Sequence, residues 1–512
     1  MKYLVGLDVG TSGAKALVVD EQGALAAETT CEYPLLTPRP NWAEQHPQDW
    51  WNASAEAIQT AIADSGIEPG QIAGVGLSGQ MHGSVFLDSA SEVIRPAILW
   101  CDQRTQKQCD WITEQVGETT LHEETLNPVL TGFQAPKIVW LRDNEPDNYD
   151  HVEMILLPKD YIRFRLTGEF ATEVSDASGT SLLNVRTRQW SQAMLDGIGL
   201  DQAMLPEVYE SHVVSGEITA EAASLTGVPE GTPVVGGGGD QAAGAVGNGI
   251  VRTGAISITT GTSGVVFAYL DEPVMDDKLR THTFCHAVDG KWHAMGVMLS
   301  AGGSLRWMRD TLCSDEVAAA GQAEIDPYEL MTQEAAQSPP AANGLIFLPY
   351  LTGERCPYPD PDARGVFFGL NLTNQKRDMI RAVMEGVAFG LRDSFDLIGG
   401  LGVAFSDVRL SGGGARSELW RQIQADILDH EVTTINVDQG AAYGAALLAA
   451  VGAGLYPDVQ AACETAIETV SRLQPQPETV QTYQRYYDIY QNLYQSLKDD
   501  FSQLSSLTEM QD

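Results

Sequence analysis

The sequence predicts an α/β protein built from two similar halves, and two observations carry this prediction. Short runs of β-branched and apolar residues alternate with stretches of helical periodicity along the chain. The tetrapeptide Gly-Thr-Ser-Gly occurs twice, at Gly10 and at Gly261, each time between two strand-like segments. A repeated strand–turn–strand context is typical of an internal duplication. We therefore expect domains over residues 1–248 and 249–475, followed by a helical tail over residues 476–512.

The individual elements follow from local patterns. Clustered apolar and β-branched residues between Gly-containing turns predict strands at residues 3–9, 14–20, 24–31, 72–77, 255–260, 265–270, 281–287 and 408–410. Apolar residues at helical spacing predict helices at residues 47–67, 374–398, 418–428, 441–455 and 480–507, and a helix-rich stretch over residues 102–168.

The charge balance excludes several classes of partner. The 512 residues include 31 Lys plus Arg against 69 Asp plus Glu, a net charge of −38. Such a surface repels nucleic acid and anionic membranes, so we expect neither as a partner. An evenly acidic surface also suggests a salt-rich cytoplasm, with an ordinary acidic enzyme as the alternative.

Several segments of the chain bear on its location. No apolar run reaches the roughly 18 residues of a membrane span. The first residues place Asp8 where a signal peptide needs an apolar core, so we expect a cytoplasmic protein. The 7 Cys include no Cys-x-x-Cys, which argues against a disulfide framework or a Cys-rich zinc site.

The two repeated turns are candidate phosphate sites. Gly10, Thr11 and Ser12 would present backbone N–H groups and hydroxyls on one side, which suits an anion, and Asp8 could hold Mg²⁺ there. Gly261 and Thr262 would do the same in the second half, so that two turns grip a polyphosphate from both sides. For each turn taken alone, the alternative is an ordinary hairpin.

A third Gly-rich turn contains Gly413 and Gly414 and leads from a strand into a helix that begins at Glu418. Free N–H groups and the positive end of the helix dipole would attract a nucleotide to it. The alternative is tight packing between strand and helix. The spacing does not match the dinucleotide fingerprint Gly-x-Gly-x-x-Gly.

Three further groups of polar residues each allow a functional and a structural interpretation. Asp240, inside a Gly-rich segment, could be a general base or could cap the helix that follows. Gln80 and His82 could bind sugar hydroxyls, but a single His is more often a satisfied, half-buried residue. His282, Cys285 and His286 are zinc-type ligands, although on a strand Cys285 would point away from the two histidines.

Three motifs resemble a known family. Residues 6–12, residues 135–141 and residues 365–370 running on to Asp378 and Glu385 are similar to signatures of the sugar-kinase family that includes glycerol kinase, gluconokinase and xylulokinase. The resemblance covers essentially the whole chain. It implies two duplicated actin/hexokinase-like (ribonuclease H-like) ATPase domains around a central cleft.

The resemblance also implies an activity and a set of site residues. Residues 78–83, 95–100, 157–161 and 284–287 are most similar to the branch that transfers phosphate from MgATP to the C5 hydroxyl of D-xylulose. Gln241 departs from this branch, where Asn is usual. The implied roles are base for Asp240, Mg²⁺ and phosphate orientation for Asp8, sugar binding for Gln80, Met81, His82 and Gln241, and ATP binding for Gly10, Thr11, Ser12, Lys15, Gly261, Thr262, Gly302, Gly413, Gly414 and Glu418.

Other functions remain open at this point. One alternative is a kinase for another ketose or polyol, such as ribulose or glycerol. Another is a nucleotide-switched regulator on the same fold, which would need no residue to receive a hydroxyl proton. A homodimer is possible.

Overall fold

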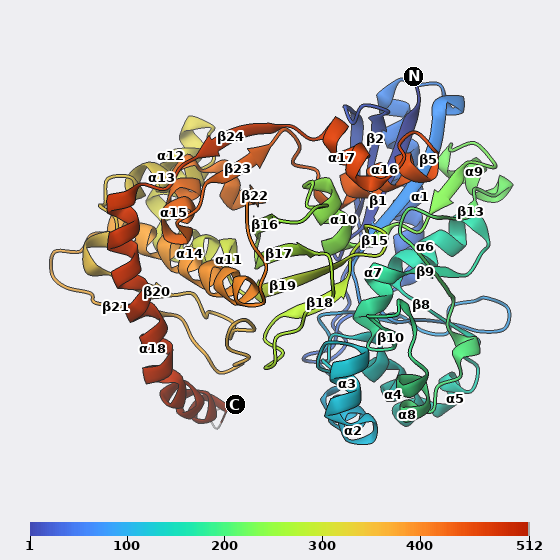
Figure 1. Ribbon diagram of the computed structural model, residues 1–512, viewed down its shortest axis with the longest axis horizontal. Coiled ribbons are helices and arrows are strands. Elements are labelled where there is room, and N and C mark those ends of the chain that lie inside the picture. Colours follow the sequence, from blue (N-terminus) through green and yellow to red (C-terminus); the bar gives the residue numbers. More distant parts are fainter. Residues whose placement is uncertain (510–512) are drawn as a thin grey trace.

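The computed structural model describes residues 1–509, and it contains two lobes, each built on a seven-stranded sheet (Figure 1). The final three residues of the predicted tail, 510–512, lie outside the described residues. The first sheet has the order β13-β14-β5-β1-β2-β3, with β15 beside β5. Its strands are β1 (Tyr3–Val9), β2 (Gly13–Asp20), β3 (Leu25–Glu32), β5 (Ile72–Gly79), β13 (Val214–Glu217), β14 (Pro233–Val235) and β15 (Gly238–Gly239).

The second sheet repeats the central pairing of the first. Its order is β18-β19-β17-β16-β22-β23-β24. In the first sheet β1 pairs antiparallel with β2 and parallel with β5; in the second, β16 pairs antiparallel with β17 and parallel with β22. The strands are β16 (Ala255–Thr260), β17 (Gly264–Leu270), β18 (His282–Cys285), β19 (Trp292–Met298), β22 (Asp407–Ser411), β23 (Val432–Ile435) and β24 (Thr469–Leu473).

Helices cover both sheets, and further short strands form separate two-stranded sheets. The helices of the first half are α1 (Pro47–Ser65), α2 (Gln106–Val116), α3 (Glu118–Glu124), α4 (Gln134–Asn144), α5 (Pro146–Tyr149), α6 (Pro158–Thr167), α7 (Val174–Ala177), α8 (Gln192–Ile198), α9 (Ala220–Thr226) and α10 (Asp240–Gly247). Those of the second half are α11 (Gly302–Leu312), α12 (Ser314–Ala323), α13 (Pro327–Ala335), α14 (Lys376–Gly400), α15 (Glu418–Leu428), α16 (Gly440–Gly452), α17 (Val459–Ala466) and α18 (Pro477–Glu509). The short strands are β4 (Glu44–Gln45), β6 (Val85–Leu87), β7 (Ala97–Ile98), β8 (Met154–Leu156), β9 (Ala171–Glu173), β10 (Leu183–Asn184), β11 (Gln189–Trp190), β12 (Glu207–Tyr209), β20 (Ile346–Leu348) and β21 (Val366–Phe368).

Most predicted elements are present, with shifted ends. Both predicted hairpins form, and α15 has the predicted bounds. The helix-rich stretch over residues 102–168 is less uniform than expected, because β8 and a non-helical segment at 125–133 interrupt it. Within residues 1–509, no helix is both long and apolar enough to cross a bilayer.

Helix α16 joins the two lobes through backbone contacts. It belongs to the second half of the chain, yet it packs on β1 and β5 of the first sheet and on α10 (Figure 1). A Cβ on Gly76 would lie 1.9 Å from the Ala445 carbonyl oxygen, and one on Gly444 would lie 1.8 Å from the Ala243 carbonyl oxygen. Glycines on both sides therefore let these backbones touch, which a larger residue would prevent.

The long helix α14 forms the centre of the second core, and α18 covers it. Tyr483 and Tyr490 of α18 are fully buried against α14. The Tyr483 hydroxyl donates to Glu385 Oε1 at 2.7 Å, and Tyr487 donates to Asp393 Oδ1 at 2.6 Å. The C-terminal helix therefore shares the core of the second lobe.

Candidate active site

Three neighbouring parallel strands of the first sheet end at one edge, and each leads to a predicted site residue. Strands β1 and β15 both run parallel to β5, where Asp8 and Gly238 both pair with Ser78. Gln80 follows β5 directly, and Asp240 follows β15. Ligands of open α/β sheets bind outside the carboxyl ends of such strands. The structure therefore brings Asp8, Gln80 and Asp240 together at a position suited to a substrate.

The charge of Asp8 acts on Asp240. Burial raises the pKa of Asp240 to about 7, with the negative charge of Asp8 as the second cause and hydrogen bonds from Gln241 opposing both. Burial also raises the pKa of Asp8, while the Ser78 hydroxyl and the Lys15 ammonium lower it. A carboxylate whose pKa lies near neutral pH is suited to accept a proton from an alcohol.

The conformation of the first hairpin turn is fixed by hydrogen bonds, some of them from the Gln80 side chain. The Gly10 N–H donates to the Gly13 carbonyl at 3.0 Å, which closes the turn. The Gln80 amide accepts from the Thr11 hydroxyl at 3.4 Å and donates to the Gly10 carbonyl at 3.3 Å. The turn is therefore fixed by Gln80, and Ser12 is left exposed at its tip.

Lys15 lies on the strand beside Asp8. The two residues are directly paired across β1 and β2, so their side chains share one face of the sheet. The Lys15 ammonium forms a 3.0 Å ion pair with Glu28 and donates to the amide oxygen of Gln439. Lys15 thus connects the first hairpin to the loop before α16.

His82 and Met81 lie beside the segment that carries Asp240. His82 has a left-handed backbone (φ 69°), and its Nδ1 is 2.7 Å from the Gly179 carbonyl oxygen. Its ring stacks on Phe133 at 4.5 Å, and burial lowers its pKa to about 3, so the ring is neutral. A Cβ on Gly239 would lie 2.9 Å from the Met81 side chain. Met81 therefore lies against the residue before Asp240, and both Met81 and His82 lie within reach of a Cβ on Gly179.

The second hairpin borders a cavity of about 780 Å³ in the second lobe. The Gly302 N–H donates to the Gly261 carbonyl at 2.7 Å, and a Cβ on Gly302 would lie 2.5 Å from that oxygen. Five predicted nucleotide residues line the cavity, which are Gly261, Thr262, Gly302, Gly413 and Gly414. Pockets of this size commonly hold small molecules and cofactors.

Glu418 does not join this group. It begins α15 and is exposed, and it is absent from the cavity lining, which instead contains Ser417 and Trp420. Ser417 caps α15 by accepting a 3.2 Å hydrogen bond from the Trp420 N–H, and both of these residues line the cavity.

One loop connects the cavity with the carboxylates. Arg416 lines the cavity and forms a 3.1 Å ion pair with Asp438. The next residue, Gln439, accepts from Lys15, whose charge reaches Asp8. A chain of contacts therefore leads from the second lobe to the edge of the first sheet, although neither Asp8 nor Asp240 lines the cavity itself.

This geometry argues against two alternative interpretations, that Asp240 caps a helix and that His282, Cys285 and His286 bind zinc. The N-cap of α10 is Gly239, and Asp240 is the first helical residue, so Asp240 does not occupy the capping position. His282 contacts the Asn127 side chain, His286 contacts the Ile250 carbonyl and Cys285 contacts the Val185 carbonyl. These three residues therefore have separate partners, and no metal-binding group of His, Cys, Asp and Glu occurs among residues 1–509.

The sequence reasoning did not single out Arg355. Its charge lowers the pKa of both His82 and His282, so it lies near the site from the second lobe. Within the part of the chain that the structure describes, its guanidinium has no hydrogen-bond or ion-pair partner. Its position in Gly353-Glu354-Arg355 carries no periodic signal, so only the fold places it here.

These features define a class of protein. A duplicated α/β fold with paired glycine-rich hairpins and two carboxylates at a sheet edge matches a sugar kinase. Sequence models of the FGGY family of carbohydrate kinases match residues 3–247 for its N-terminal domain and 256–453 for its C-terminal domain. The chain belongs to this family, and the predicted fold class and enzyme class are confirmed.

Several individual sugar kinases are similar to this chain over nearly its full length. The chain is 39% identical to the xylulose kinase of Bacillus subtilis over 98% of each chain, and 38% identical to that of Escherichia coli over 96% of this chain and 99% of the other. Among solved structures, it is similar to a xyloylose kinase from Brucella ovis (TM-score 0.87, 36% identity, 96% and 99% covered). A ligand-bound xylulose kinase from Lactobacillus acidophilus is also similar (TM-score 0.90, 27% identity, 98% and 100% covered).

Proposed function

We propose that this protein transfers the γ-phosphoryl group of ATP to the C5 hydroxyl of D-xylulose. The observation that carries the proposal is the pair Asp8 and Asp240 at the edge of the first sheet, in a chain whose full-length relatives are xylulose kinases. The product is D-xylulose 5-phosphate, and ADP is released.

Asp240 acts as the general base in this proposal. The C5 oxygen attacks the γ-phosphorus as its proton passes to the Asp240 carboxylate, and the bond from that phosphorus to the β,γ-bridging oxygen breaks. Phosphoryl transfer has a loose, highly charged transition state, so positioning and electrostatics supply most of the rate. Few cations are available in a chain of net charge −38, so backbone N–H groups carry much of this task.

The sugar lies against Gln241, Met81 and His82. The neutral His82 ring offers one nitrogen to a hydroxyl while Gly179 occupies the other. Gln80 acts indirectly, because its amide is engaged with the Gly10–Thr11 turn. Arg355 reaches the same region from the second lobe.

The nucleotide occupies the 780 Å³ cavity. Glycines at its walls let a flat ring lie against the backbone, and Thr262 lies at the end from which phosphates extend toward Asp8. Thr11, Ser12 and Lys15 meet the phosphates from the first lobe. Closure of the lobes would exclude water, which competes as acceptor.

The residues fit Mg²⁺ at Asp8. Its Oδ1 is buried and has no hydrogen-bond partner among residues 1–509. Mg²⁺ is commonly held by one or two carboxylates together with substrate phosphates, so a large protein ligand set is not required. A bound Mg²⁺ would neutralise charge on the phosphates.

We further expect the protein to work in the cytoplasm and to form a homodimer. Fractionation of the cells that produce the protein measures its location, and recovery in the membrane fraction would contradict the cytoplasm. Light scattering on the purified protein measures the assembly state, and a monomer mass would contradict the dimer.

A turnover assay tests the proposed function. D-xylulose, D-ribulose, L-ribulose and glycerol are compared with MgATP in an assay that detects ADP, and D-xylulose should give the highest kcat/KM. An Asp240→Ala control should lose transfer by about 10²- to 10⁴-fold while it still binds ATP. A preference for another sugar would support the ketose or polyol alternative, and ATP turnover unaffected by any sugar would support the regulator.

A further inference from the structure

The base segment, residues 236–239 before Asp240, has no side chains to hold it. All four residues are glycine, so packing of side chains cannot fix the segment. A Cβ on Gly237 would lie 2.0 Å from the Leu77 carbonyl oxygen, so the segment lies flush against β5. Glycine also has the greatest backbone freedom of all residues. Something outside the segment must therefore set the position of Asp240.

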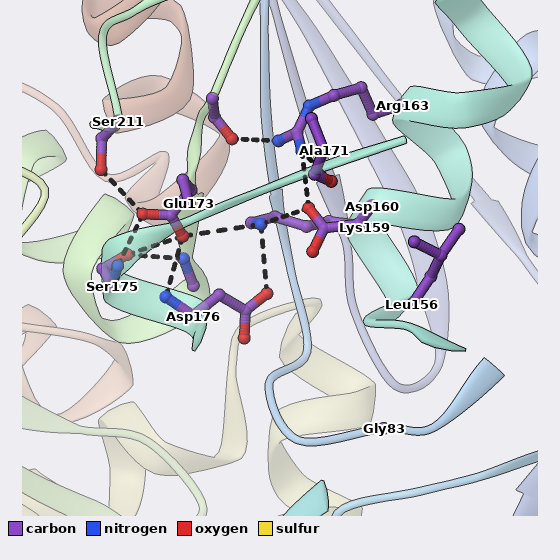
Figure 2. Close-up of polar contacts among 12 residues, drawn as sticks. Gly83, Leu156, Lys159, Asp160, Arg163, Ala171, Glu173, Ser175, Asp176 and Ser211 are labelled. Carbon is purple, nitrogen blue, oxygen red and sulfur yellow. Dashed lines mark hydrogen bonds and ion pairs between the residues drawn. The ribbon is translucent and has the colours of Figure 1, made fainter. Parts of the chain in front are cut away.

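A buried charged cluster lies directly behind this segment. We define it by Lys159, Asp160, Arg163, Glu173 and Asp176, whose side chains are fully buried. Figure 2 shows Lys159 between Asp160 and Arg163 on one side and Glu173 and Asp176 on the other. Its Nζ is 2.7 Å from Asp160 Oδ1, 3.3 Å from Asp176 Oδ2 and 3.5 Å from Glu173 Oε1.

The cluster combines two cations, Lys159 and Arg163, with three carboxyl groups. Burial raises the pKa of Asp176 well above its usual value, and the charge of Lys159 opposes this shift. Buried ion pairs of this kind are rarely a source of stability, but they can specify geometry.

The cluster contacts the base segment at both ends. Arg163 donates to the Gly236 carbonyl oxygen at one end. At the other end the Gly239 N–H donates to the Ser175 hydroxyl oxygen at 3.1 Å. The Ser175 hydroxyl in turn donates to Glu173 Oε1 at 2.9 Å (Figure 2). Gly239 immediately precedes Asp240, so this second contact is the closer one to the reacting carboxylate.

Glu173 is held rigidly enough to serve as an anchor. It accepts from the backbone N–H groups of Ser175 at 2.7 Å and Asp176 at 2.8 Å, and from the Ser211 hydroxyl at 2.9 Å. Its polar partners come from three segments of the chain, since the Lys159 ammonium of α6 also lies 3.5 Å from Oε1. A carboxylate with this many donors has little freedom to turn.

We infer that Ser175 and Glu173 are positioning residues that hold the Gly239 N–H and thereby set the direction of the Asp240 carboxylate. They touch no substrate. This inference rests on the proposed role of Asp240 as base. Without the Ser175 hydroxyl, the segment would be anchored by Arg163 and the backbone alone, and the carboxylate would sample orientations that do not reach the sugar hydroxyl.

Ser175→Ala tests the inference, with Ser338→Ala as the matched control. Ser338 is also a buried serine that donates to a carboxylate, Asp378 Oδ1 at 2.6 Å, but it belongs to the second lobe and none of its hydrogen bonds reaches the base segment. Ser175→Ala should lower kcat by about 10- to 100-fold with the KM for ATP unchanged, as small displacements of a catalytic group do. The acid limb of the kcat/KM profile should move to lower pH, because water then reaches Asp240. Ser338→Ala should leave both at the wild-type values.

A second measurement requires no substrate. Hydrogen–deuterium exchange of the peptide spanning residues 236–241 should become faster in Ser175→Ala and stay at the wild-type rate in Ser338→Ala. Glu173→Gln, which keeps the side-chain volume, should change in the same direction and is the alternative variant if Ser175→Ala does not fold. Wild-type exchange together with a wild-type pH profile would overturn the inference. Faster exchange in a protein that does not phosphorylate D-xylulose would support the positioning role and reject the proposed function.

Discussion

Burial acts in opposite directions on the pKa values of Asp240 and His82. It raises the pKa of Asp240 to about 7 and lowers that of His82 to about 3. In both cases the charged form loses its hydration. The site therefore contains a base whose protonation changes near neutral pH beside an imidazole that stays neutral.

The pKa of Asp240 predicts the pH dependence of the free enzyme. The base must be ionised, so kcat/KM for D-xylulose should fall as pH drops below about 7, approaching tenfold per pH unit. A steady-state profile between pH 5 and 9 measures this limb. A plateau that extends to pH 5 would contradict the role of Asp240.

Asp240→Asn provides the control for that profile. The folded pKa lies above the unfolded value near 3.8, so ionisation of Asp240 costs stability as pH rises through about 7. The variant should therefore have a higher Tm than the wild type at pH 8, and the difference should narrow toward pH 5. Its residual activity should show no acid limb.

At the scale of elements, the contact between α10 and α16 decides how the lobes join. Their axes approach closely because glycines remove side chains from the contact. Gly6 of β1 and Gly76 of β5 do the same on the sheet side, where a Cβ would lie 2.0 Å and 1.9 Å from carbonyl oxygens of α16. The predicted boundary at residue 248 stays a prediction, since α16 comes from the second half and packs on the first.

Two glycines of α10 give a matched test. A Cβ on Gly247 would lie 2.3 Å from the Gly440 carbonyl oxygen, whereas one on Gly244 would meet nothing within 4 Å. Gly247→Ala should lower the free energy of unfolding by about 1–3 kcal/mol or more, because the backbone must move. Gly244→Ala should raise it by roughly 0.5–1 kcal/mol through the lower helix cost of alanine. Urea unfolding measures both, and equal effects would show that the contact is not tight.

For the whole molecule, the net charge of −38 is the largest electrostatic feature. Like charges spread over one surface repel one another and oppose the compact state. The buried ion pairs described above are shielded from salt, so added salt acts mainly on the surface.

Stability should therefore rise with salt. Raising KCl from 0.1 M to about 1 M shortens the screening length from roughly 10 Å to 3 Å, and we expect Tm to increase by a few degrees. Thermal unfolding in a KCl series measures the effect, with sucrose of equal osmolality as the control. A flat Tm up to molar KCl would contradict both the expected effect and the hypothesis of a salt-rich cytoplasm.

The sequence by itself determined the local features of this protein. Both hairpins, the helices α14 and α15 and the strand end that carries Asp8 follow from periodicity and turn chemistry, which act between near neighbours in the chain. The short strand β15 before Asp240 was not expected, because its sequence is all glycine. The family resemblance implied that Glu418 binds the nucleotide. Ser417 and Trp420 line the cavity while Glu418 does not, so its role stays a prediction.

Only the tertiary structure decided which of these features meet. Three contacts join segments that are far apart in sequence. They are the packing of α16 on the first sheet, the approach of Arg355 to His82 and the charged cluster around Lys159. Contacts between glycine backbones and buried ions carry no periodic signal, because they depend on which surfaces the folded chain brings together. The base segment is the clearest case: its sequence shows four glycines, and its rigidity comes from residues elsewhere in the chain.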